Sequence, residues 1–397
     1  MSDDLGALFL RHVCQTSPAP LGITVARAAG TTVWDTRGEA WLDLLAGMGV
    51  ANVGHTHPAV VAAVRAQAER HLHVMVYGEL VQETQVRLAR RLAELLAPSL
   101  DVVYFTSSGA EAIEGALKTA RKHTGRPRLV AFEGGFHGDT FGALSIGGNA
   151  VYRTPFAPLL PDVTLLPFDD VRALDAIDER TAAVVVEPVQ AEAGVRIPSP
   201  AFLPALRRRC DETGALLVLD EVVTGLGRTG RLFAHEHAGV LPDLLILAKA
   251  LGGGLPLGAF VGRAAVMATL SHDPPLAHVT TFGGHPLSCA AGLAALDVLL
   301  RDDLPRRAAT LGAEVLRRLR PLVGHGGLRD VRGIGLLVGL ELDTAADCAR
   351  FARRARERRL ILNWTLHRDT VIRLAPPLVL TDAELDEATR RIADALG

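Results

Sequence analysis

Seven short apolar runs alternate with helical segments between residues 102 and 262, and this alternation limits the folds open to the chain. Each run is apolar along its whole length rather than at every second position, which is typical of strands buried on both faces. Such strands, separated by helices, form a mostly parallel sheet with helices on both sides. We therefore predict an α/β fold. The runs are VVYF at 102, RLVAF at 128, VTLLPF at 163, AAVVVEPV at 182, ALLVLDEV at 215, DLLILA at 243 and AFVG at 259.

The sequence pattern changes on either side of this region, which predicts three parts. Residues 1–57 contain two short predicted strands about a D-T-R-G turn, residues 58–285 form a large domain, and residues 286–397 form a smaller α+β domain. The N-terminal strands are expected to pack with the smaller domain. Within the smaller domain, LILNWTLHRDTVIRLAPPLVL is predicted to form a hairpin. Thr381 and Glu384 have the spacing of a capping box, which predicts a final helix.

The charge of the chain and its first residues exclude several classes of partner. The net charge is −2 at pH 7, whereas nucleic acids and anionic membranes favour a strongly basic surface. The first residues lack the features of a secretory signal, and no apolar run reaches the ~18 residues that a membrane span needs. We therefore expect a cytoplasmic protein without nucleic-acid or membrane partners. The four cysteines, at 14, 210, 289 and 348, have no CxxC spacing, so no zinc site or disulfide framework is expected.

Lysine is rare in this chain. Of 42 lysines and arginines, only Lys118, Lys122 and Lys249 are lysines. Lys249 interrupts an apolar run that ends in three glycines, DLLILAKALGGG. A buried lysine can lose its proton and attack a carbonyl carbon, whereas arginine stays protonated. Lys249 is therefore predicted to act chemically rather than as a simple positive charge.

Polar residues at the carboxyl ends of two further strands are candidates for a ligand site. Residues 107–110, Ser-Ser-Gly-Ala, follow VVYF at a predicted helix start, where small residues expose N–H groups to a phosphate. A plain serine N-cap is the alternative. Asp220 follows five apolar residues, and a carboxylate there needs a distant cationic partner or a ligand. A structural ion pair is the alternative for Asp220.

A phosphate cradle, a buried carboxylate and a buried lysine together fit one cofactor, pyridoxal 5′-phosphate. The phosphate would bind at the helix start, the aldehyde would condense with Lys249, and Asp220 would keep the ring nitrogen protonated. Once free, the lysine amine could carry a proton to and from the substrate. Phe136 and His137 lie in a glycine-rich loop and Val222 follows Asp220, so these residues are candidates for contact with the ring faces.

Two other kinds of site can be compared with this one. Gly225, Gly227 and Gly230 have the GxGxxG spacing of a dinucleotide fold, but they do not follow the strand directly and no helical pattern begins at Gly230. The histidine pairs at 55/57 and 71/73 lack the flanking ligands and the spacing of a metal site, so no metal is expected.

Over nearly its whole length the chain resembles the class III (ornithine-type) aminotransferases of the pyridoxal-phosphate fold-type I superfamily. The resemblance implies a large domain with a mostly parallel seven-stranded sheet and a smaller C-terminal domain. The matching stretches, in family order, are LLAGMGVANVGHTHP, SSGAEAIEGALKTAR, FHGDT, EPVQAEAGV, LVLDEVVTGLGRTGRLFAHE, PDLLILAKALGGG, TTFGGHPLSCAAGLA, VRGIGLLVGLEL and IRLAPPLVL.

The resemblance also implies the residues that bind the cofactor. Lys249 would be the Schiff-base lysine, Asp220 the partner of the pyridine nitrogen, and Phe136 and Val222 the contacts on the two ring faces. Thr281 would reach the phosphate of the other subunit, which implies a homodimer with shared active sites. The further cofactor-binding residues would be Ser108, Gly109, Ala110, His137 and Glu187.

Substrate binding, on the same resemblance, would involve Glu192, Arg373, Asp139 and Thr280. In the family the arginine binds a substrate α-carboxylate, and the glutamate masks it when an ω-amino group enters. Two residues depart from the acetylornithine and ornithine enzymes: Asp139 replaces a usual arginine and would repel a carboxylate, and Val223 replaces a common glutamine. The diaminopelargonate branch also has the GDT sequence, but it typically lacks the glutamate at 192.

The sequence thus predicts an enzyme, an ω-aminotransferase that moves the terminal amine of an ornithine-like or N-acylated diamino acid to 2-oxoglutarate by a ping-pong exchange. Diaminopelargonate and 4-aminobutyrate aminotransferases are the alternatives within the class. An NAD(P)-dependent oxidoreductase and a non-catalytic binding protein on the same fold are the alternatives from other classes.

Overall fold

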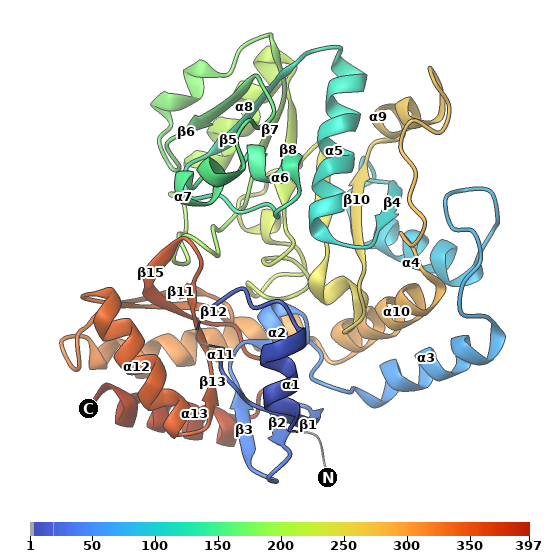
Figure 1. Ribbon diagram of the computed structural model, residues 1–397. Helices are drawn as coiled ribbons and strands as arrows, with labels where there is room; N and C mark the ends of the chain where they lie inside the picture. The colour runs from blue at the N-terminus through green and yellow to red at the C-terminus, as the bar shows by residue number, and fades with distance from the viewer. Residues whose placement is uncertain (1–3, 19) are drawn as a thin grey trace.

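A seven-stranded sheet forms the centre of the larger part of the molecule (Figure 1). The computed structural model describes residues 4–18 and 20–397. The strands are β4 (Val102–Thr106), β5 (Arg128–Phe132), β6 (Val163–Leu166), β7 (Thr181–Val186), β8 (Leu216–Asp220), β9 (Leu244–Leu247) and β10 (Gly258–Gly262). Their order is β4-β10-β9-β8-β7-β5-β6, and only β10 runs antiparallel to its neighbours. The predicted mostly parallel sheet of seven strands is confirmed.

Helices cover both faces of this sheet, which explains why its central strands are apolar throughout. Successive side chains of a strand point to opposite faces. In β8, Leu217 and Leu219 belong to one core cluster, together with side chains of α4, α8 and α10, whereas Leu216 and Val218 pack in a second cluster with α5. These helices are α4 (Glu83–Leu95), α5 (Gly109–Thr124), α8 (Phe202–Thr213) and α10 (Pro286–Arg301).

The N-terminal strands form a second sheet that includes a strand from the other end of the chain. Its strands are β1 (Val25–Ala29), β2 (Thr32–Asp35), β3 (Ala40–Asp43) and β13 (Leu360–Ile361), in that order. The predicted pair of strands about the D-T-R-G turn is confirmed as β2 and β3. β1 was not predicted, because its mostly exposed residues give no apolar pattern. β13 pairs in parallel with β3, so the N-terminal segment is joined to the C-terminal part.

The C-terminal part contains a third sheet covered by helices. Its strands, in order, are β11 (Leu328–Ile334), β12 (Leu337–Leu342), β15 (Arg368–Leu374) and β14 (Asn363–Thr365), and its helices are α11 (Leu304–Leu319), α12 (Ala345–Glu357) and α13 (Asp382–Leu396). The predicted hairpin is confirmed as β14 and β15. The predicted capping box is also confirmed: Thr381 Oγ1 accepts from Glu384 N at 3.2 Å, and Glu384 Oε2 accepts from Thr381 N at 2.8 Å.

The domain boundaries at residues 58 and 286 stay predictions. α10 packs against α3 (Pro58–Arg70) and α4, so this helix, placed in the smaller domain by the sequence analysis, lies against helices of the larger one. No helix within residues 4–18 and 20–397 is long and apolar enough to cross a membrane. The remaining α-helices are α1 (Leu5–His12), α2 (Ala46–Gly49), α6 (Phe141–Ser145), α7 (Ala150–Arg153) and α9 (Ala264–Met267). Short 3₁₀ helices span Thr154–Phe156, Arg172–Ala176, Ala234–His237, Lys249–Gly252, Ala268–Ser271 and Arg320–Leu322.

Candidate active site

A cavity of about 400 Å³ lies beyond the carboxyl ends of β4, β8 and β9. This is the edge of an α/β sheet at which ligands bind, and the volume falls within the range of small-molecule and cofactor sites. The fold therefore brings together residues that the sequence analysis selected from separate strand ends. The predicted site residues that line the cavity are Ser108, Gly109, Ala110, Phe136, His137, Glu187, Glu192, Asp220, Val222 and Lys249.

Lys249 follows β9 and lines the cavity, with no hydrogen-bond or ion-pair partner in the described part of the chain. Its backbone φ is +49°, a left-handed conformation that residues with side chains rarely adopt and that clusters at functional sites. Burial lowers the pKa of Lys249; Glu192 opposes this shift, and the cation of Arg373 adds to it. The amine is therefore neutral more often than an exposed lysine amine at the same pH.

Asp220 is buried at the end of β8 and is held by two hydrogen bonds. His137 Nδ1 lies 2.8 Å from Asp220 Oδ2, and Val222 N donates to Asp220 Oδ1 at 3.0 Å. Burial disfavours a charge on His137, but its hydrogen bond to Asp220 and the charges of Asp220 and Glu187 raise its pKa overall. From the sequence, either a distant cation or a ligand was expected as the partner of Asp220. In the structure, His137 is the hydrogen-bond partner of Asp220, and Asp220 also lines the cavity, where it can contact a ligand.

Glu187 lies just after β7 and anchors the loop that carries Phe136. Its Oε1 accepts from Phe136 N at 3.0 Å and its Oε2 from Ala191 N at 3.1 Å. Burial raises the pKa of Glu187 to about 7, with His137 opposing and Asp220 adding to the shift. Glu187 therefore changes its charge near neutral pH while it holds this side of the cavity in place.

The start of α5 forms another wall of the cavity. The Ser108 side chain accepts from Glu111 N at 3.2 Å, so the simple N-cap considered for this serine is present. Gly109 and Ala110 are the first two helical residues, whose N–H groups have no partner within a helix. A Cβ on Gly109 would lie 3.0 Å from Val222, so only glycine fits there without displacement. Ser108 therefore caps the helix, and the N–H groups of Gly109 and Ala110 are still free to bind a phosphate.

Glu192 and Arg373 form a buried ion pair between Oε1 and Nη1. The two residues are 6 % and 2 % exposed. Burial by itself would raise the pKa of Glu192, but the charge of Arg373 together with a hydrogen bond from Leu366 N lowers it overall. Arg373 Nη2 also contacts Met48 Sδ at 3.4 Å. Two of the four residues that were predicted to bind substrate are thus in contact, and Glu192 lines the cavity.

Four predicted residues do not line the cavity: Arg373, which pairs with the lining residue Glu192, and Asp139, Thr280 and Thr281. Asp139 is exposed, next to the lining residue Gly138, and has no hydrogen-bond or ion-pair partner among the described residues. Thr280 is half-buried and its Oγ1 accepts from Gly283 N at 3.0 Å, whereas Thr281 is exposed. The role of Thr281 at the other subunit's phosphate stays a prediction.

The tip of the β14–β15 hairpin, Leu366 and His367, was not predicted as part of the site. Leu366 N donates to Glu192 Oε2 at 2.9 Å, and the His367 ring packs edge-on to Phe136 with centroids 5.8 Å apart. Figure 1 shows the hairpin rising from the C-terminal part toward α7. The hairpin itself was predicted, but no sequence pattern indicates where its tip docks, because that depends on how the two parts of the molecule pack.

These residues fit pyridoxal 5′-phosphate. A lysine with a lowered pKa and no partner, an aspartate held by a histidine, and unpaired N–H groups at a helix start meet in one cavity. At the carboxyl edge of a mostly parallel seven-stranded sheet, this set defines a pyridoxal-phosphate-dependent enzyme of the fold-type I class.

The chain belongs to the class-III aminotransferase family, whose model matches residues 14–396. It is 46 % identical over 375 residues to the acetylornithine aminotransferase of Methanopyrus kandleri, covering 94 % of each chain. It is 41 % identical over 396 residues to the putrescine aminotransferase of Pectobacterium atrosepticum, covering 96 % of this chain and 84 % of the relative. The structure of Toxoplasma gondii ornithine aminotransferase, with partial occupancy of pyridoxal phosphate at the active site, is similar with a TM-score of 0.92 and 36 % identity, covering 100 % of this chain and 94 % of that one. The protein is therefore a transaminase that uses this cofactor.

The family settles the alternatives from other classes. The oxidoreductase alternative is wrong: the glycines at 225, 227 and 230 lie in a run of turns after β8, and no helix begins at Gly230. The non-catalytic alternative is wrong as well, because the relatives are aminotransferases. Within the described ranges, no group of three or more histidine, cysteine, aspartate or glutamate side chains is placed to hold a metal ion.

Proposed function

We propose that this ω-aminotransferase moves the terminal amino group of an ornithine-like or N-acylated diamino acid to 2-oxoglutarate by a ping-pong mechanism. The observation that carries the proposal is that Glu192, in a buried ion pair with Arg373, lines the same cavity as Lys249. Similarity to acetylornithine and ornithine aminotransferases supports a donor of this kind.

The roles of the cofactor-binding residues follow from their surroundings. Pyridoxal phosphate, when bound, withdraws electrons from the carbon that carries the substrate amine. Lys249 would hold the cofactor and, as a free amine, move the proton at that carbon, which its lowered pKa favours. Asp220, oriented by His137, would keep a proton at the ring nitrogen. Phe136 and Val222 would contact the ring faces, and the N–H groups of residues 109–110 would bind the phosphate.

Glu192 and Arg373 would allow one site to bind the amino donor and the carboxylate acceptor in turn. An arginine binds a carboxylate through two parallel hydrogen bonds, so a free Arg373 suits the α-carboxylate of 2-oxoglutarate. While Glu192 is paired with Arg373, the carboxylate neutralises the charge of the guanidinium. The absence of net positive charge at Arg373 favours the entry of a terminal amine. Glu192 would therefore have to leave Arg373 between the two halves of the exchange.

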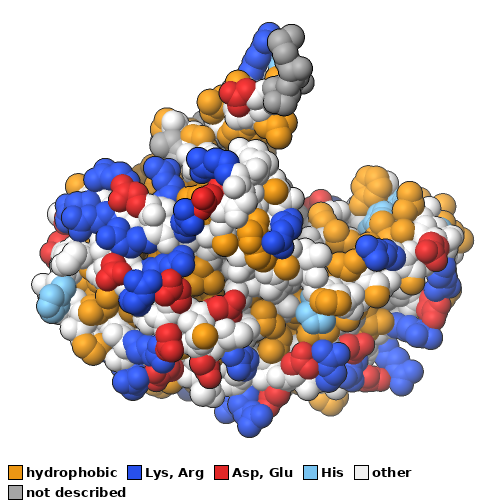
Figure 2. All heavy atoms as spheres, turned by 90° about the horizontal axis from the view of Figure 1, so that it is seen from below, with side chains coloured by type: hydrophobic (Ala, Val, Ile, Leu, Met, Phe, Trp, Pro, Cys, Tyr) orange, Lys and Arg blue, Asp and Glu red, His pale blue; other side chains and the backbone are white. Residues whose placement is uncertain are grey.

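A homodimer with shared active sites is part of the proposal. Two segments of the chain carry many exposed large apolar side chains, and they meet where the His73 and Phe282 rings lie 5.0 Å apart. Figure 2 shows hydrophobic side chains gathered on the right of the molecule, the side on which Figure 1 places α3 and the loop that follows it. Exposed patches of this kind mark interaction surfaces. The residues are Leu72, Met75, Leu80, Val81, Leu276, Val279 and Phe282.

Asp139 bears on the identity of the donor. Its exposed, unpaired carboxylate would repel a donor carboxylate that the family's usual arginine attracts. Diaminopelargonate and 4-aminobutyrate therefore stay as alternative donors, and similarity to a putrescine aminotransferase adds a diamine to them. Replacement of Asp139 by arginine is expected to lower the KM for acetylornithine; an unchanged or higher KM would count against this role.

A donor panel tests the proposal directly. The purified holoenzyme is mixed with ornithine, acetylornithine, lysine, 4-aminobutyrate, diaminopelargonate or putrescine, and the visible absorbance of the bound cofactor is followed before 2-oxoglutarate or pyruvate is added. A ping-pong exchange bleaches the absorbance with donor alone and restores it with acceptor alone. No bleaching by ornithine or acetylornithine would remove the proposed donor class. A monomer in light scattering would remove the homodimer. The cytoplasmic location stays a prediction.

A further inference from the structure

We propose that the tip of the β14–β15 hairpin, Leu366–His367, is a latch that holds Glu192 on Arg373, with Tyr152 and His367 as its positioning residues. The inference rests on the proposed gating role of Glu192. It adds that a second structural element sets how readily the gate opens, and therefore the balance between amine donors and carboxylate acceptors.

Both carboxylate oxygens of Glu192 are occupied, and both partners come from the same hairpin. Oε1 pairs with Arg373 Nη1 in β15, and Oε2 accepts from Leu366 N at the tip at 2.9 Å. The backbone is tied to the tip as well, because His367 N donates to Glu192 O at 2.9 Å. Glu192 is therefore held by the tip at both its main chain and its side chain.

The tip is in turn docked on the larger part of the molecule by side chains that do not touch Glu192. Tyr152 Oη donates to Leu366 O at 2.8 Å, and His367 Nδ1 donates to Gly134 O at 3.0 Å. The His367 ring also stacks on Tyr152, with centroids 5.3 Å apart, and lies edge-on to Phe136. Tyr152 and His367 thus fix the position of the Leu366 N–H group.

The Leu366 N–H group restrains the Glu192 carboxylate only while the hairpin tip itself is held in place. While Leu366 N is held, Oε2 is bound and Oε1 stays at Arg373, so opening requires the carboxylate to turn about the Leu366 hydrogen bond. When the tip is loosened, that second hydrogen bond weakens and Glu192 leaves Arg373 more easily. Arg373 then binds carboxylates more readily. Its positive charge is also neutralised less completely by Glu192, which disfavours binding of the amine donor. The KM values of donor and acceptor should therefore move in opposite directions.

The test compares the holoenzyme with Tyr152→Phe and His367→Ala, using the amine donor that the panel identifies and 2-oxoglutarate. We expect the KM for 2-oxoglutarate to fall and the KM for the donor to rise, with their ratio changing roughly fivefold, the effect of losing about one hydrogen bond. Calorimetric binding of glutarate, a dicarboxylate without a keto group, should tighten by a similar factor. His367→Asn, whose amide can donate to Gly134 O, should restore much of the ratio.

Tyr104→Phe is the matched control. Tyr104 Oη donates to His278 O at 2.9 Å, so the substitution removes the same kind of bond, from a tyrosine hydroxyl to a loop carbonyl, without contact to Glu192. The KM ratio and glutarate binding should stay as in the wild type. A purely structural role of Tyr152 would instead change stability, or move both KM values in the same direction.

Glu192→Ala separates failure of the latch from failure of the gate. If Glu192→Ala leaves the KM ratio and glutarate affinity unchanged, the gating role itself is wrong. If Glu192→Ala changes both but Tyr152→Phe and His367→Ala change neither, the gate stands and the latch is overturned. Should His367→Ala fail to fold, Tyr152→Phe still decides, since it removes one oxygen atom and retains the ring.

Discussion

Lys249 differs from the two other lysines of the chain in its surroundings. Lys118 Nζ donates to Ala277 O at 3.2 Å and Lys122 Nζ donates to His272 O, so both are occupied by loop carbonyls. Lys249 has no such partner among the residues that the structure describes, and burial lowers its pKa. We expect Lys249→Ala to reduce kcat by at least about 10²-fold, the lower end of general acid–base contributions. Lys122→Ala is the control and should transaminate at the wild-type rate. A Lys249→Ala enzyme with normal single-turnover rates would contradict the assignment.

Glu187 should make stability depend on pH. Its pKa is raised from 4.5 to about 7, so the folded protein retains a proton that the unfolded chain releases near pH 4.5. The contribution of Glu187 to stability is therefore complete below about pH 4.5 and is lost as pH rises through about 7. At about 1.4 kcal/mol per pKa unit, the loss is roughly 3 kcal/mol.

Glu187→Gln should remove this dependence. Both proteins are compared without cofactor. We expect the free energy of unfolding of Glu187→Gln to fall less between about pH 5 and pH 8 than that of the wild-type protein. Urea unfolding at the two pH values measures the difference. An equal change in the free energy of unfolding between the two pH values for both proteins would show that Glu187 titrates normally in the folded state.

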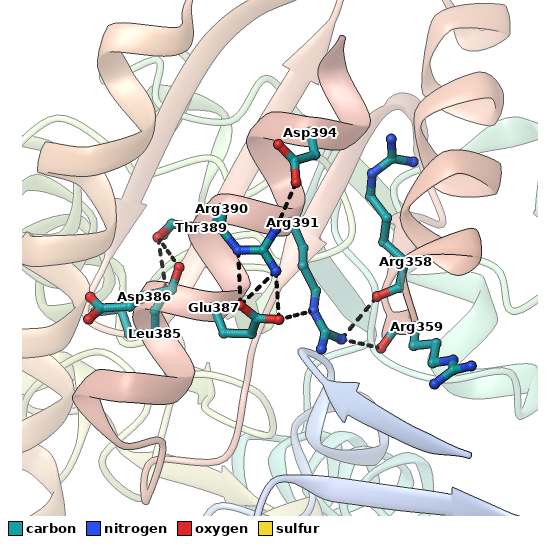
Figure 3. Close-up of polar contacts among 9 residues, drawn as sticks. All are labelled: Arg358, Arg359, Leu385, Asp386, Glu387, Thr389, Arg390, Arg391 and Asp394. Carbon is teal, nitrogen blue, oxygen red and sulfur yellow. Dashed lines mark hydrogen bonds and ion pairs between the residues drawn. The ribbon is translucent and has the colours of Figure 1, made fainter.

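At the scale of elements, α13 stabilises the end of α12 through one arginine (Figure 3). Arg391 Nη1 donates at 3.0 Å to the carbonyl of Arg358, the C-cap residue of α12, which a helix end otherwise leaves free. It also donates at 3.4 Å to Arg359 O, which accepts from Leu42 N as well. The neighbouring Arg390 lies on the exposed side of α13 and bonds only to side chains of the same helix, including Glu387.

This difference between neighbours can be measured. Arg391→Ala should lower the free energy of unfolding by about 1–2 kcal/mol, because it removes a charged hydrogen bond to the half-buried carbonyl of Arg358. Arg390→Ala should have a clearly smaller effect, as expected for exposed ion pairs within a helix. Urea unfolding of the two variants provides the comparison. If both variants lost the same stability, the contact between α12 and α13 would not depend on Arg391.

At the scale of the whole molecule, Arg228 joins three parts of the chain. It is fully buried, and its guanidinium donates to Asn52 Oδ1 at 2.6 Å, to Leu336 O at 3.0 Å and to Pro376 O at 2.5 Å. These partners come from the N-terminal segment and from two places in the C-terminal part. Burial lowers the pKa of Arg228 to about 9. The GLGRTG stretch thus serves packing between the parts rather than nucleotide binding.

Arg228→Met should lower the free energy of unfolding by about 3 kcal/mol or more, since it leaves three buried acceptors without a donor. Arg231→Met, an exposed arginine in the same segment, should change it by less than about 0.5 kcal/mol. Urea unfolding checks both variants. A similarly small effect of Arg228→Met would mean that water satisfies the acceptors.

How much of the site could be predicted depended on how local its signals were. Lys249 and Asp220 could be recognised because each is a polar residue at the end of an apolar strand, a pattern contained within about ten residues. The N-cap at Ser108 and the capping box of α13 are equally local. β1 was missed because its exposed residues carry no apolar pattern, so only pairing with β2 defines it as a strand.

The sequence by itself determined the α/β class, the seven strands of the central sheet and the candidate lysine, because burial periodicity and strand-end residues act over short distances. Only the tertiary structure decided which groups meet. His137 and Asp220 are 83 residues apart, and Glu192 is 181 residues from Arg373 and 174 from Leu366. No local propensity encodes such contacts, since they depend on how whole elements pack. For that reason the docking of the hairpin tip on Glu192 could be seen only in the folded chain.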